Sequence, residues 1–138
     1  DERYLPNLKE VNGVYAFQQA WHSYRPVKNR FADFINLTAI YGNYAFTYAF
    51  AYSEVSRIRF GISTIDYQPS GKKTSVYVFD RLALNASELT SVEFPNLTSI
   101  NTNYTFNYAF ESCSKLSSIE FPVLKSIGKT TNSNWYGT

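Results

Sequence analysis

The twelve residues LTSVEFPNLTSI at positions 89–100 decide the fold, because they return as LSSIEFPVLKSI at positions 116–127. The second copy follows the first by 27 residues, and the apolar residues and the proline of the two copies coincide. A fixed period of about 20 to 50 residues is typical of proteins built from stacked repeats. The stretch Leu89–Leu124 therefore contains one complete repeat and the start of the next.

More divergent copies precede this stretch. Leu5-Pro6-Asn7-Leu8 resembles the start of a repeat, and related segments begin at Phe34 and Phe60. A phenylalanine inside an aromatic block follows nine residues after Leu8, and the same spacing recurs after Leu37 and Leu97. We predict a single domain, residues 1–138, of about five repeats: approximately 5–33, 34–59, 60–93, 94–120 and a partial repeat or cap at 121–138.

Three segments depart from the period. Asp66–Ser75 lengthens the third repeat and contains Lys72-Lys73 beside turn-forming residues, which predicts a protruding loop. The polar segment Lys129–Tyr136 is expected to cover the last layer, because each repeat buries its apolar face only against neighbours. The start of the chain has no comparable cap, which suggests a trimmed chain or a partner there. Over residues 22–34 the pattern is weak, and only Arg25–Val27 is expected to begin a strand.

Each repeat is expected to contain a strand and a helical turn. Val92 and Phe94 alternate across a polar residue, which predicts a short parallel strand whose copies stack ~4.8 Å apart. The inward side chains of such strands form columns along the stack. The block Tyr-Ala-Phe-x-x-Ala-Phe at residues 44–50 places aromatic residues at i and i+4, which we interpret as one or two turns of helix.

Residues 110–128, FESCSKLSSIEFPVLKSIG, resemble the BspA-like leucine-rich repeats of bacterial and protist surface proteins. That family places an aromatic residue, Cys, Leu, Ile, Pro, Ile and Gly at these positions, and Tyr44-Ala45-Phe46 matches its Tyr-Ala-Phe element. The resemblance covers most of the chain and is closest over residues 94–128. The departures are the Tyr- and Asn-rich aromatic blocks, the loop at 66–75, and Gly61 in place of the proline after Phe60.

The resemblance implies a leucine-rich-repeat solenoid. Short parallel β-strands would stack in a curved sheet, with short helical or 3-10 turns and loops on the other side. It further implies an extracellular or cell-surface location and adhesion to host or matrix proteins, or to other microbes. By the same resemblance, Cys113 occupies a repeat position that usually faces the interior, which favours a structural thiol over a nucleophile.

The composition excludes several classes of function. The chain has 44% hydrophobic residues, 18% aromatic residues and a net charge of +2 without runs of like charge, so neither nucleic acid nor an anionic membrane is an expected partner. Its single cysteine excludes an internal disulfide framework. No apolar run approaches the ~20 residues of a membrane span, and no signal segment is recognisable in this chain.

We find no catalytic, cofactor-binding or metal-binding set in the sequence. Glu93 and Glu120 fall on equivalent positions of adjacent predicted strands, a spacing that also occurs in glycosidases and calcium sites. Arg59 takes the same position on the preceding strand, which indicates a solvated charge ladder instead. The single histidine, His22, has no recurring partner and is expected at the surface. Asn-x-Ser/Thr sequons occur at Asn36, Asn85, Asn96 and Asn103.

The polar residues between the apolar strand positions vary in charge from repeat to repeat, and we predict that they form the binding face. The candidate residues are Ser56, Arg57, Arg59, Thr90, Ser91, Glu93, Ser117, Ser118 and Glu120. The leading hypothesis is a non-enzymatic recognition module for a protein or glycoprotein partner. The alternatives are a structural spacer within a larger surface protein, and a carbohydrate-binding module that uses exposed tyrosines such as Tyr48 and Tyr108.

Overall fold

The fold consists of short parallel strands. The computed structural model describes residues 5–26, 30–65 and 76–128, and within them there are three sheets and no helix. The first sheet pairs β1 (Glu10–Val11) with β3 (Ala39–Ile40). The second contains, in order, β2 (Phe31–Phe34), β4 (Arg57–Phe60), β6 (Ser91–Glu93) and β8 (Ser118–Glu120). The third contains β5 (Thr64–Ile65), β7 (Ser99–Ile100) and β9 (Ser126–Ile127).

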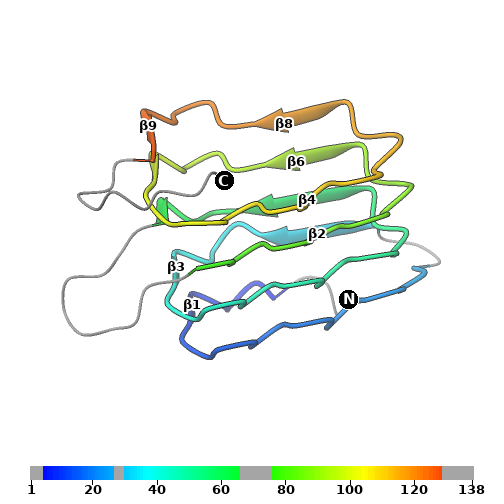
Figure 1. The fold of residues 1–138 in the computed structure, drawn as a ribbon, viewed down its shortest axis with the longest axis horizontal. Helices are drawn as coiled ribbons and strands as arrows, with labels where there is room; N and C mark the ends of the chain where they lie inside the picture. The colour runs from blue at the N-terminus through cyan, green and yellow to red at the C-terminus, as the bar shows by residue number, and fades with distance from the viewer. Residues whose placement is uncertain (1–4, 27–29, 66–75, 129–138) are drawn as a thin grey trace.

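Successive strands of each sheet come from successive repeats, so the layers stack in chain order (Figure 1). Hydroxyl-to-carbonyl hydrogen bonds between neighbouring layers join residues 26, 34 and 27 positions apart, from Ser56, Thr90 and Ser117 in turn. The largest of these separations spans the segment 66–75. The predicted stack of short parallel strands is confirmed, but the repeats contribute two strands each where one was expected, one to the four-stranded sheet and one to a smaller sheet.

Strand β2 lies where the sequence pattern was too weak to predict a strand. Its residues Phe31, Ala32, Asp33 and Phe34 pair with Arg57–Phe60 in parallel register. Ala32 and Phe34 are buried in the core, while the large apolar Phe31 lies on the outer face beside Asp33. The pattern is weak here because a small residue faces inward and an aromatic residue faces outward.

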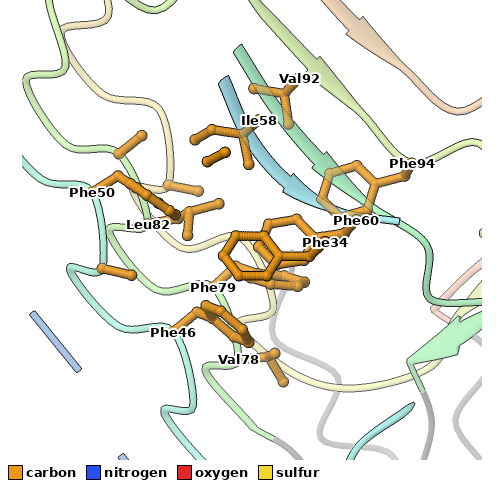
Figure 2. Packing of buried hydrophobic residues seen from close by; sticks show 14 of the residues in the cluster. Phe34, Phe46, Phe50, Ile58, Phe60, Val78, Phe79, Leu82, Val92 and Phe94 are labelled. Atoms are coloured by element: carbon orange, nitrogen blue, oxygen red, sulfur yellow. The ribbon is translucent and has the colours of Figure 1, made fainter. Parts of the chain in front are cut away.

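The core is built from two interlocking columns of phenylalanines. One column rises from the sheet, with ring centroids 5.0, 5.6 and 5.1 Å apart from Phe34 through Phe60 and Phe94 to Phe121. The second rises on the opposite side and consists of Phe17, Phe46, Phe79 and Phe106. Phe46 meets Phe60 edge to face, and Phe79 meets Phe94 in the same way. Figure 2 shows these side chains packed together in the core. The predicted inward columns are therefore confirmed.

The prediction of helical turns in the aromatic blocks is wrong. We call residues 15–24, 44–53, 77–86 and 104–113 the turn wall. Every second residue of its first three segments donates its N–H to the next layer, as Phe46 does to Val78 at 2.9 Å and Phe50 to Leu82 at 2.8 Å. The residues between them donate to the carbonyl three positions earlier, as Ala49 does to Phe46. The aromatic spacing of four therefore belongs to a ladder of turns.

The spacing between layers explains why a helix does not form. Strands in the sheet lie ~4.8 Å apart, whereas packed helices need about 8–10 Å between axes. A wall of helices would force the layers further apart on that side than in the sheet. Its backbone hydrogen bonds would also stay within each helix. The turn wall instead bonds directly from layer to layer, and the layers lie nearly parallel in Figure 1. The turn wall therefore does not produce the curvature that we expected for the sheet.

The turn wall holds every non-glycine residue with a positive φ angle among the described residues. These residues recur every fourth position, with φ between 49° and 59°. They are Tyr15, Gln19, Ser23, Tyr44, Tyr48, Tyr52, Tyr77, Arg81, Asn85, Tyr104, Tyr108 and Ser112. In the turns 46–49 and 50–53 the positive φ falls on the third residue, as in a type II turn. A residue with a Cβ is strained in this conformation, so the interlayer bonds must hold it there.

This strain gives a prediction at Ser112, an exposed residue with a φ of 59°. Replacing Ser112 by glycine should raise the free energy of unfolding by about 0.5–1 kcal/mol, because glycine adopts positive φ without strain. Replacing it by valine should lower that free energy by about 1 kcal/mol or more, because β-branched residues resist this region. Guanidinium unfolding of both variants measures the difference. Equal stabilities of the two variants would contradict the assigned backbone conformation.

Two predicted segments lie outside the described residues. They are the loop at 66–75 with Lys72-Lys73, and the C-terminal segment from Lys129 to Tyr136.

Candidate functional site

The predicted binding face lies on the outer side of β2, β4, β6 and β8, which we call the sheet face. Backbone pairing places Asp33, Arg59, Glu93 and Glu120 in one row across the four strands. The predicted ladder of Arg59, Glu93 and Glu120 is therefore confirmed, and Asp33 extends it by one strand. A second row runs two residues earlier on each strand and consists of Phe31, Arg57, Ser91 and Ser118.

Two arginine–carboxylate pairs organise the sheet face. Arg57 donates to Glu93 from Nε at 2.5 Å and from Nη2 at 2.9 Å, so both carboxylate oxygens are bound. Arg59 donates in the same two-pronged way to Asp33, with its Nε 3.0 Å from Oδ1 and its Nη2 on Oδ2. Each pair crosses between neighbouring strands. Two parallel charge-assisted bonds fix both side chains, so this part of the face is rigid.

Phe31 lies under both guanidinium groups. The Cζ atoms of Arg57 and Arg59 lie 4.5 and 5.1 Å from the centre of its ring, within cation–π range. The hydrogen bonds to Glu93 and Asp33 raise the pKa of Arg57 and Arg59 respectively, against the lowering effect of burial. The two cations therefore remain charged while they are held over one aromatic ring.

A chain of ion pairs lies beside the N-terminal ends of the strands. Arg30 lies 3.5 Å from Glu54 and 3.5 Å from Glu88, and Glu88 also binds Lys115 at 2.7 Å. The hydrogen bond from Lys115 lowers the pKa of Glu88, together with the charges of Lys115 and Arg30. These groups neutralise one another and border the sheet face without joining its two rows.

The candidate binding residues with a hydroxyl group just before the strands bind the backbone of the preceding layer. Ser56 donates to the carbonyl of Arg30, Thr90 donates to that of Ser56 at 2.8 Å, and Ser117 donates to that of Thr90 at 3.1 Å. Their hydroxyls therefore form a column that ties the layers together. Glu120 is exposed at the last strand, next to Glu93 in the row.

Asp33 and Phe31 are the site residues that sequence reasoning missed. Both belong to β2. In this strand a small residue faces inward and a large aromatic residue faces outward, which is the reverse of the usual pattern. One signal was available in the sequence. Phe34 aligns with Phe60 and Phe94, and counting back one residue from Phe34 puts Asp33 at the position of Arg59 and Glu93. Extending the repeat towards the N-terminus would have placed an acidic residue in the ladder.

Among the described residues, Cys113 and His22 bind different neighbours and do not contact each other. The thiol of Cys113 donates to the carbonyl of Ala83 at 3.0 Å, and the residue is half-buried against the core. His22 is exposed, with its Nδ1 2.9 Å from the hydroxyl of Ser23 and its ring beside Tyr52. The expected surface position of His22 is confirmed, and Cys113 packs as a structural thiol.

Cys113 should react slowly with alkylating reagents. Burial raises the pKa of its thiol, although a backbone hydrogen bond from Ala86 lowers it, so little thiolate is present at neutral pH. We expect iodoacetamide to modify the folded protein about ten-fold or more slowly than it modifies the unfolded chain. Mass spectrometry of samples quenched over time, with and without guanidinium, measures both rates. Equal rates would place the thiol at an accessible and activated position.

Within residues 5–26, 30–65 and 76–128, no group of three or more His, Cys, Asp or Glu residues is arranged to hold a metal ion. In the same ranges no helix has the length and hydrophobicity to cross a bilayer. Two sequon asparagines, Asn36 and Asn96, donate their side-chain amides to the carbonyls of Pro6 and Gly61 in the preceding layer.

Comparison of the chain with protein-family models, with curated proteins and with solved structures gives no match.

Proposed function

We propose that this chain is a leucine-rich-repeat solenoid of the BspA-like type that acts as a non-enzymatic recognition module at a cell surface or in a secreted protein. The period of 27 residues between the last two copies and the stack of parallel strands support the proposed repeat architecture. The proposed context of adhesion and location comes from the resemblance of residues 94–128. The proposed partner is a protein or glycoprotein that binds the sheet face.

One observation carries this proposal. Four charged side chains of the sheet face are held in place before any partner arrives, because two bidentate ion pairs close over Phe31. Ordering long side chains on binding costs about 0.5–1.5 kcal/mol for each one, and side chains that are already fixed avoid that loss. Arginine and aromatic residues are also the types that carry most of the binding energy in protein interfaces.

The test reverses the charge pattern while keeping the ion pair. In the double variant R57E/E93R the same two positions still hold opposite charges, and the net charge of the protein does not change. We expect binding to a matrix protein, selected from a panel of purified extracellular-matrix proteins, to weaken about ten-fold or more. Unchanged affinity would show that the sheet face is not the binding surface. Circular dichroism and thermal unfolding of the variant confirm that it is folded.

The spacer hypothesis is favoured by a different feature of the same face. Its arginines are satisfied by carboxylates of the protein itself, and such pairs also stabilise neighbouring layers against each other. A spacer would bind no member of the panel, and R57E/E93R would change only its unfolding temperature.

A further inference from the structure

A second surface lies on the turn wall, on the opposite side of the core from the sheet. The residues with positive φ form a grid of three columns across four layers, and none of the twelve is buried. Residues two positions further along, such as Phe46 and Phe79, are fully buried. We call this grid the tyrosine face. The seven tyrosines in it are Tyr15, Tyr44, Tyr48, Tyr52, Tyr77, Tyr104 and Tyr108.

The first column is a continuous stack of tyrosine rings. The ring centroids are 5.0, 4.9 and 4.5 Å apart from Tyr15 through Tyr44 and Tyr77 to Tyr104. Because each inner ring is covered on both faces, the stack turns edges and hydroxyl groups outward. The face of an aromatic ring carries partial negative charge and its C–H edge carries partial positive charge, so the exposed ring edges of this column are electropositive.

The second column places a guanidinium between two tyrosines. The Cζ atom of Arg81 lies 5.5 Å from the ring centre of Tyr48 and 4.9 Å from that of Tyr108. Tyr108 is 55% exposed. Arg81 is the only charged residue of the twelve, so this surface has a single positive centre.

Arg81 is anchored to the protein through one nitrogen. Its Nη1 binds both oxygens of Asp80, at 3.2 and 2.9 Å, and Asp80 also accepts a bond from Asn107 at 2.7 Å. The side chain of Asp80 is only 5% exposed, whereas that of Arg81 is 33% exposed. Among the described residues no acceptor binds Nε or Nη2 of Arg81. These donors lie at the surface between two rigid rings.

The charge state of these groups is fixed at neutral pH. Burial lowers the pKa of Arg81, but the charge of Asp80 and the neighbouring Tyr48 outweigh it, and the net pKa is raised. Burial, followed by the neighbouring Tyr104 and Tyr44, raises the pKa of Tyr77. The guanidinium therefore stays cationic, and the phenol of Tyr77 stays a hydrogen-bond donor.

We infer that the tyrosine face binds an acidic segment of a partner protein, and that a carboxylate of this segment binds the outer donors of Arg81 between Tyr48 and Tyr108. Guanidinium groups bind carboxylates through two parallel bonds. Tyrosine, serine and asparagine, with arginine at the centre, are also the residues that antibody loops use to bind proteins, because tyrosine provides rigid contact area at a low entropy cost. This inference is independent of the sheet face.

The stacking of the rings favours a protein over a glycan. A sugar packs on the open face of an aromatic ring. Here the rings of the first column cover one another, and Arg81 lies against those of Tyr48 and Tyr108. The covered rings turn edges and hydroxyls outward beside the guanidinium donors, and these groups match carboxylates and backbone carbonyls.

The probe for this inference is poly-L-glutamate, titrated into the protein at about 0.15 M salt and followed by tryptophan and tyrosine fluorescence and by calorimetry. Polygalacturonate, a saccharide that carries carboxylates, is titrated in parallel. The key variant is D80N/R81Q, which removes the guanidinium without changing the net charge or leaving a buried carboxylate unpaired. The matched control is E88Q/K115Q, which removes a lysine that is 56% exposed, more than Arg81 is.

We expect D80N/R81Q to weaken poly-L-glutamate binding about ten-fold or more, and E88Q/K115Q to change it less than about two-fold. Should D80N/R81Q fail to fold, Y108N removes one ring and keeps a residue that tolerates positive φ; it should weaken binding several-fold. The inference is overturned if poly-L-glutamate does not bind, or if the folded Arg81 or Tyr108 variant binds as the wild type does. Binding of polygalacturonate without binding of poly-L-glutamate would overturn it in favour of an acidic polysaccharide.

Discussion

Replacing Phe60 by alanine is expected to lower the free energy of unfolding by about 3–5 kcal/mol. Phe60 is completely buried and lies where the two phenylalanine columns interlock. Its ring stacks between Phe34 and Phe94, meets Phe46 edge to face at 5.0 Å, and lies 4.8 Å from Phe79. Alanine would leave a cavity in the middle of the stack. The layers cannot move together to close this cavity, because hydrogen bonds in the sheet and in the turn wall hold them apart on both sides. Urea unfolding followed by circular dichroism measures the loss.

The matched control is Val123→Ala. Val123 is 43% exposed and follows the last strand of the sheet, so its truncation removes little buried area. We expect a loss below about 1 kcal/mol. If the two variants lost equal stability, the two interlocked columns would not be the core of this protein.

Replacing Gly61 by alanine is expected to destabilise the protein by about 3 kcal/mol or more, or to prevent folding. A Cβ atom at this position would overlap the carbonyl oxygen of Ile35 and lie 2.5 Å from its carbonyl carbon, inside the 3.0 Å that real Cβ atoms respect. The obstacle is backbone of the preceding layer, which is fixed by the pairing of β2 with β4. The added methyl therefore cannot be accommodated by a change of rotamer.

Gly13→Ala is the control for this effect. Its Cβ would meet the methyl of the exposed Ala16 at 3.3 Å, and that neighbour is free to shift by a few tenths of an ångström. A change within about 0.5 kcal/mol is expected from thermal or chemical unfolding. Equal unfolding free energies for Gly61→Ala and the wild type would disprove the close approach of the layers at Ile35.

The same contact explains why Gly61 departs from the repeat. Equivalent positions in the later copies hold proline, at Pro95 and Pro122. The N–H of Gly61 donates to the carbonyl of Phe34 at 3.0 Å, a bond that proline cannot make. The absence of both a side chain and a ring is therefore a requirement of packing between these two layers.

The two surfaces differ in how far the sequence could identify them. The register of the sheet face followed from the repeat, because residues at the same repeat position must lie in one row across parallel strands. The partners within the rows did not follow. Asp33 and Glu93 are both in register with Arg59, and Arg59 binds Asp33, whereas Arg57 binds Glu93 diagonally. An arginine side chain reaches neighbouring positions on both adjacent strands, so only the packed structure selects its carboxylate.

The tyrosine face could not be predicted, because its existence depends on the backbone of the turn wall. Aromatic residues at i and i+4 suit a helix as well as a ladder of turns, and intrinsic spacing does not distinguish them. In a helix these tyrosines would also lie on one face, but neighbouring helices with axes about 8–10 Å apart would hold the copies in successive layers too far apart to stack. In the turn wall each fourth residue has positive φ and points away from the core, which brings Tyr48, Arg81 and Tyr108 into one column.

The sequence by itself determined the period, the stack of short parallel strands and the inward columns, because a residue that recurs at one repeat position must meet its own copy in the next layer. Only the tertiary structure decided the form of the second wall. The strands fix the layer spacing at ~4.8 Å, and a backbone that bonds between layers satisfies that spacing where a helix cannot. That constraint acts between residues 26 to 36 positions apart, so no local stretch of sequence records it.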